Sequence, residues 1–119
     1  MDVVDGGVGG RCGVQFFTRY YYDKGETEPW DDGKMRPFWD AVAALGVPVY
    51  FTLQAQAGQR YSSAERESYM DEQRNLLRWM ERYPDVTVVV THGLQWRTFL
   101  EGDEFRFPEE GWEIFQSPR

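Results

Sequence analysis

His92 is the only histidine in the chain and the residue best suited to acid–base chemistry. Histidine is the residue type most often used to accept or release a proton during a reaction near neutral pH. His92 and Gly93 follow residues 86–91, a β-branched run that predicts a buried strand. Parallel α/β proteins place reactive groups at this end of their strands. These observations make His92 a candidate catalytic residue, and they leave open the alternative that it only caps the strand end through backbone hydrogen bonds.

The alternation of side chains along the predicted strands places further polar residues near His92. If His92 points inward from its strand, Val88 and Val90 do so too. If Thr52 points inward from its own strand, then Thr52, Gln54 and His92 gather at one end of the sheet. Gln15, Gln54 and Trp96 are candidates on position alone. No metal ligand is predicted. The predicted substrate-binding residues are Gln15, Thr52, Gln54 and Trp96.

Two other patterns could carry chemistry, but each has a plainer interpretation. Residues 1–13 contain five glycines, whose backbone N–H groups could hold a phosphate. No helix pattern follows them, so residues 1–12 are predicted to be a flexible or turn-rich lead-in. The predicted helix from Ser62 to about Tyr83 carries Asp71 and Glu72 among other carboxylates. Arginines interleave with these acids, which favours a solvent-exposed face of salt bridges over an acid–base pair.

The elements that position these residues follow a regular order. Predicted strands begin near residues 14, 49 and 86, and one predicted helix lies in each interval. This βαβαβα order predicts parallel strands joined by right-handed crossovers. The first helix, residues 37–45, has proline in its first turn and ends before Gly46. Its predicted apolar stripe consists of Phe38, Ala41, Val42 and Leu45.

Composition limits the classes of function. The chain has 13 basic and 20 acidic residues and a net charge of −7, which argues against nucleic acid as a partner. No apolar run approaches the roughly 18 residues that would span a membrane. The lone Cys12 cannot form an internal disulfide, which fits a cytoplasmic location. Aromatic residues make up 17% of the chain, so much of the core must consist of rings.

Two segments carry a family resemblance. The run RPFWDAVAALGVPVYFTL, followed by NLLRWMERYPDVTVVVTHG, resembles the amidohydrolase-related family of metal-dependent TIM-barrel enzymes. That family includes hydrolases and non-oxidative decarboxylases of aromatic acids. The resemblance covers residues 13–96 and corresponds to the middle of the barrel. It implies that residues 1–119 are a parallel βαβαβα segment holding about three of the eight units of a TIM (β/α)8 barrel.

The resemblance also implies a divalent metal, usually zinc, and a small organic acid or amide as substrate, aromatic acids included. His92 matches the sixth-strand histidine of the family, which lies at the metal centre, usually as a contact to the substrate or to a metal ligand. The resemblance therefore implies a catalytic role for His92. Thr52 stands where the family has its fifth-strand histidine, and a threonine hydroxyl is a poor zinc ligand. The family's His-x-His pair is absent because His92 is the sole histidine. We therefore expect a fragment that is inactive alone and cannot hold zinc by itself.

Two hypotheses of other classes stay open. The chain could be a small, non-catalytic α/β binding or interaction module that covers its sheet edges by forming a homo-oligomer. Alternatively, Tyr20–Tyr22 and Trp30, in a predicted loop, could stack on a sugar.

Overall fold

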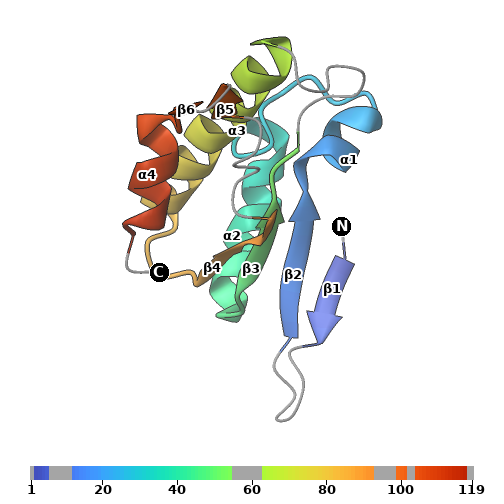
Figure 1. Cartoon of the computed structure of the whole chain (residues 1–119). Coiled ribbons are helices and arrows are strands. Elements are labelled where there is room, and N and C mark those ends of the chain that lie inside the picture. Colours follow the sequence, from blue (N-terminus) through green and yellow to red (C-terminus); the bar gives the residue numbers. More distant parts are fainter. Residues whose placement is uncertain (1, 6–11, 55–62, 93–98, 102–103, 118–119) are drawn as a thin grey trace.

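A four-stranded sheet forms the centre of the computed structural model (Figure 1), which describes all residues except 1, 6–11, 55–62, 93–98, 102–103 and 118–119. The strands are β1 (Asp2–Asp5), β2 (Cys12–Phe17), β3 (Val49–Thr52) and β4 (Val88–Val90), in that spatial order. β2, β3 and β4 run parallel, and β1 pairs antiparallel with β2. The predicted parallel α/β order is confirmed as a three-stranded parallel sheet that alternates with helices and is not closed into a barrel.

Helices and one small hairpin complete the described fold. The helices are α1 (Thr18–Asp23), α2 (Arg36–Leu45), α3 (Ser63–Arg82) and α4 (Glu109–Phe115), with a 3₁₀ turn, η1, at Gly33–Met35. β5 (Leu100–Glu101) and β6 (Glu104–Phe105) pair with each other. α2 carries Pro37 in its first turn and ends at Gly46, whose φ of 69° is left-handed, as the sequence predicts. No helix among the described residues is long and apolar enough to cross a membrane.

Two elements near the N-terminus were not predicted. β1 places Val3 opposite Val14 and Val4 opposite Gly13, although only a lead-in was expected there. Val3 and Val4 form a short β-branched pair, but the glycines that follow it favoured a turn-rich segment over a strand. α1 replaces the predicted loop after β2, because tertiary contact rather than helix propensity forms it. Its Tyr21 is buried, with its ring centroid 6.2 Å from that of Phe16.

An aromatic core lies between the sheet and the helices. Trp39 of α2 contacts Phe16 of β2, with ring centroids 5.1 Å apart, and Trp79 of α3 contacts Phe51 of β3 at 4.9 Å. Trp39 and Trp79 also meet each other at 5.4 Å. Since Phe16 and Phe51 are register partners on one face of the sheet, α2 and α3 cover that same face. The ring-based core expected from composition is confirmed.

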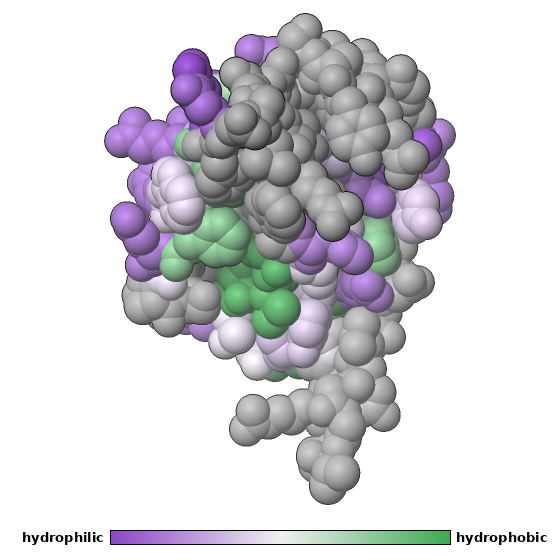
Figure 2. Space-filling model, viewed as in Figure 1, coloured by the Kyte–Doolittle hydropathy of each residue, from purple (hydrophilic) through white to green (hydrophobic). Residues whose placement is uncertain are grey.

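The other face of the sheet is more open. It carries Gln15, Tyr50 and Val89, which are aligned across β2, β3 and β4. Gln15 and Tyr50 are half-buried, and Val89 is 36% exposed. Figure 2 shows an apolar patch where β3 and β4 lie in Figure 1. An apolar strand residue on an uncovered face is typical of a surface that meets another layer.

The buried side of α2 differs from the predicted stripe. Trp39 and Val42 are buried, Phe38 is half-buried, and Leu45 is 70% exposed. Counting apolar residues at helical spacing favoured the stripe that begins at Phe38. The side of α2 that carries Trp39 faces the core instead, because the indole is buried there and its Nε1–H donates a 2.7 Å hydrogen bond to the backbone carbonyl of Trp30.

We expect Trp39→Phe to lower the free energy of unfolding by about 2 to 3 kcal/mol, because it removes buried volume and leaves the Trp30 carbonyl without a donor. Leu45→Ala on the same helix serves as the control and should cost less than about 0.5 kcal/mol. Urea unfolding of both variants measures the difference. Equal losses would contradict this assignment of the core.

Candidate functional site

The strand ends of the parallel sheet bring two of the predicted residues into hydrogen-bonded positions. Thr52 is buried, and its Oγ1 lies 2.5 Å from Oγ1 of Thr91, just after β4. The Thr91 hydroxyl also contacts the Phe51 carbonyl at 3.3 Å. One strand away, the Gln54 backbone N–H donates to Thr18 Oγ1 at 2.9 Å, so Thr18 fixes the chain as it leaves β3.

The predicted side assignment for β4 was wrong. Phe51 pairs with Val90, so Thr52 shares its face with Thr91, and Val88 and Val90 lie on the opposite face. Strand alternation alone could not decide this, because it fixes the relative directions within one strand and not the pairing between strands. Thr52 thus faces the open side of the sheet, together with Gln15 and Tyr50 one step earlier.

His92 lies at the same end of the sheet but is not joined to Thr52 by a hydrogen bond among the described residues. It is exposed, and its φ of 57° is left-handed, which is uncommon for a residue with a side chain. Gln54 is half-buried, and its Oε1 is buried without a hydrogen-bond partner within the described ranges. Trp96 falls outside the described residues.

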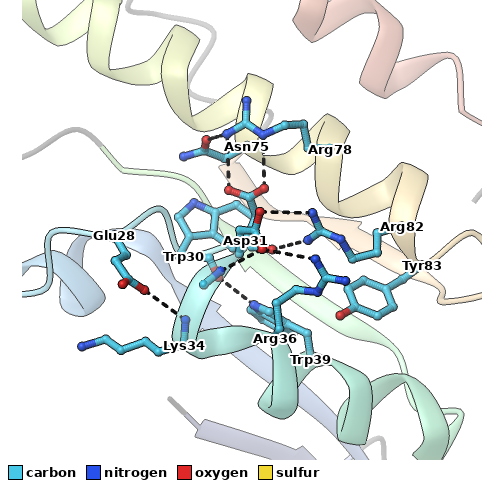
Figure 3. Close-up of polar contacts among 12 residues, drawn as sticks. Glu28, Trp30, Asp31, Lys34, Arg36, Trp39, Asn75, Arg78, Arg82 and Tyr83 are labelled. Atoms are coloured by element: carbon cyan, nitrogen blue, oxygen red, sulfur yellow. Dashed lines mark hydrogen bonds and ion pairs between the residues drawn. The ribbon is translucent and has the colours of Figure 1, made fainter.

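A second group of polar residues connects the segment 24–35 to α3 (Figure 3). Asp31 is fully buried and accepts two hydrogen bonds from Arg78, Nε to Oδ2 at 3.2 Å and Nη2 to Oδ1 at 3.4 Å. Arg82 donates to the Asp31 carbonyl, and its guanidinium lies 3.6 Å from the Asp32 carboxylate. Asn75 accepts a hydrogen bond from Arg78. These contacts hold the long segment against the helix.

Glu72 of α3 is the carboxyl group that the sequence interpretation misplaced. It was assigned to a solvent-exposed helix face, but its side chain is buried, with 4% exposure. Its Oε2 accepts a 2.8 Å hydrogen bond from the indole N–H of Trp30, which is itself fully buried. The exposed-face interpretation does hold for its neighbour Asp71, which pairs with Arg74 at 2.9 Å.

Helical spacing contained the signal for Glu72. The buried residues Tyr69, Leu76 and Trp79 recur on one side of α3, and Glu72 falls in the same register. The prediction of a solvent-exposed face included every carboxylate of this helix and therefore did not use the register position of Glu72.

Burial raises the pKa of Glu72 from 4.5 to about 7, because the ionised form loses its hydration. The hydrogen bonds from Trp30 and Thr18 oppose this shift and are outweighed by it. Glu72 also lines a polar cavity of about 320 Å³ together with Tyr22, Arg74 and Arg78. A carboxyl group that titrates near neutral pH beside a cavity can exchange a proton with a molecule bound there.

Zinc, which the family resemblance implies, does not fit the described residues. No three His, Cys, Asp or Glu side chains among them lie close enough together to hold a metal ion. The Thr52 hydroxyl, a poor zinc ligand, already forms a hydrogen bond with Thr91. Comparisons of the chain with protein-family models, with curated proteins and with solved structures found no match.

Because the folded-state pKa of Glu72 lies above its unfolded value, its protonated form favours folding. This contribution is complete below pH 4.5 and is lost as the pH rises through about 7, by roughly 3 kcal/mol in total. Glu72→Gln keeps an acceptor for Trp30 and should remove this decline. Glu81→Gln, at an exposed position on α3, should retain it. Urea unfolding from pH 4 to pH 8.5 measures both, and a decline that persists in Glu72→Gln would refute the assignment.

Proposed function

We propose that the chain forms part of an α/β barrel of the amidohydrolase-related type and that its parallel strand ends contribute to a substrate-binding surface. The observation that supports this proposal is that both α2 and α3 cover the same face of the parallel sheet. β2, β3 and β4 follow in sequence order, and α2 and α3 cover the same face. In such a barrel the helices form the outer ring and the other sheet face turns inward. The half-open face with Tyr50 and Val89 fits that inward side.

The substrate we propose is a small organic acid or amide. Thr52, Thr91 and the side chain of Gln54 offer hydroxyl and amide groups at the strand ends, where parallel α/β proteins bind ligands. His92 adds an exposed imidazole held at a left-handed backbone position. Such positions persist where the surrounding structure enforces them, and they cluster at functional sites. In this proposal His92 donates a hydrogen bond or a proton to the substrate, and no step is assigned to a metal.

A second candidate is the non-catalytic binding module. Two observations favour it. β1 pairs antiparallel with the outer edge of β2, where the next strand of a barrel would run parallel. The aromatic core also closes around Trp30, Trp39 and Trp79, which are fully buried within this chain. A module of this kind would fold and bind without further strands.

The sole histidine makes the test direct, because the imidazole proton signals in an NMR spectrum all arise from His92. Under the proposal, benzoate or benzamide shifts these signals in a saturable way, and Thr52→Val weakens the response by about fivefold, as the loss of one hydrogen bond predicts. Val90→Ile, on the helix-covered face, is the control.

Calorimetry of the same 119-residue chain separates the candidates. In one outcome, the chain melts cooperatively while neither benzoate nor benzamide shifts the His92 signals. That result would refute the substrate-binding surface and favour the module. A saturable shift that both Thr52→Val and Val90→Ile leave unchanged would place the binding elsewhere.

A further inference from the structure

A second cavity lies beside α1 at the end of β2, where its lining residue Phe17 is the register partner of Thr52. It has a volume of about 370 Å³, which is within the range of small-molecule sites. Half of its lining residues are aromatic: Phe16 and Phe17 from the end of β2, and Tyr20 and Tyr21 from α1. Thr52, Gln54 and His92 do not line it. Its ligand is therefore a separate question from the proposed substrate.

Two of the rings form a pair in which Tyr20 is exposed and Phe17 is half-buried. Phe17 and Tyr20 lie with their centroids 5.1 Å apart at an interplanar angle of 44°, and Tyr20 is 55% exposed. A tyrosine ring left in water beside an apolar cavity offers a flat surface on which a planar molecule can stack.

The charges at the rim favour an anion. Lys34 and Glu26 line the cavity and form an ion pair, so they balance each other. Lys24 also lines it and has no ion pair among the described residues. Among the residues that line the cavity, Lys24 thus remains as a positive charge without an ion pair, although the whole chain carries −7 and Glu28 acts on Lys34 from outside the lining.

Tyr21 gives an independent indication of a polar ligand group. Its hydroxyl is buried and has no hydrogen-bond partner within the described part of the chain, which is costly for a phenol. Burial raises the pKa of Tyr21, the carboxylates of Glu26, Glu28 and Asp31 raise it further, and the charge of Lys34 opposes them. The group therefore stays protonated and lies near the charged rim, so an anionic oxygen placed there would give it an acceptor.

We propose that this cavity binds a planar aromatic anion, with the ring against Phe17 and Tyr20 and the anionic group beside Lys24. Carboxylate, sulfonate and phosphate groups share the chemistry that the ammonium group recognises. The site would serve the chain whether or not the strand ends bind a substrate.

The probe for this site is 2-naphthalenesulfonate, titrated into the 119-residue chain by isothermal titration calorimetry. We expect saturable binding to one site. Lys24→Ala should weaken it by about fivefold, the upper range for an exposed ion pair, and Tyr20→Ala by a similar factor. Arg19→Ala removes a charge from α1 that lies outside the cavity lining, and it should leave the affinity unchanged. Higher salt should weaken binding to the unaltered chain.

Several outcomes would overturn the proposal. These are the absence of saturable binding, equal effects of Lys24→Ala and Arg19→Ala, or binding of uncharged 2-naphthalenemethanol with the same affinity. Both Tyr20 and Lys24 are exposed, so their variants should melt as the unaltered chain does. The His92 NMR signals, recorded in the same titration, separate the two sites: they should not follow the calorimetric curve, and a matching shift would place the probe at the strand ends.

Discussion

The burial of Trp30 is the interaction on which the rest of the described fold depends. Its indole N–H is satisfied by a buried carboxyl group on α3, and its carbonyl accepts from the indole of Trp39 on α2. One residue thus connects the segment before α2 to both covering helices. The carboxyl of Glu72 supplies the acceptor at the cost of its own hydration, which moves its titration to near neutral pH.

This arrangement explains why a long polar segment can lie over an apolar core. Asp31, next to Trp30, is fully buried yet receives the guanidinium of Arg78, and Arg82 reaches its backbone. Arg78 and Arg82 come from successive turns of α3, so the helix presents hydrogen-bond donors to the segment before α2. The sheet contributes only its Phe16 and Phe51 face to this core, which leaves its opposite face free for other contacts.

Local patterns in the sequence were sufficient for much of the fold. The strand and helix periods located β2, β3, α2 and α3, and the Gly46 signal marked the end of α2. Residue class alone was not sufficient within those elements. Leu45 was counted as core and Trp39 was not, although ring volume and an indole hydrogen bond decide which side of α2 is buried.

Predicting the candidate sites required information on strand pairing and tertiary contacts, which local sequence patterns do not contain. The pairing of Thr52 with Thr91 follows from the register between β3 and β4, which alternation within a strand cannot supply. The aromatic cavity required α1, whose helix comes from tertiary contact and not from the propensities of three tyrosines. By contrast, the burial of Glu72 was readable from its register on α3.

The contacts around Trp30 and Asp31 also have a consequence for how the chain is made. They join residues 42, 47 and 51 positions apart, so none can form until α3 has been synthesised. Until then, β2 and α2 leave the ribosome with their rings uncovered and Asp31 without its arginines. Contacts this distant in sequence slow folding and lengthen the exposure of apolar surface. A chaperone that recognises aromatic residues would therefore find the most exposed rings on the N-terminal half, before α3 has been synthesised.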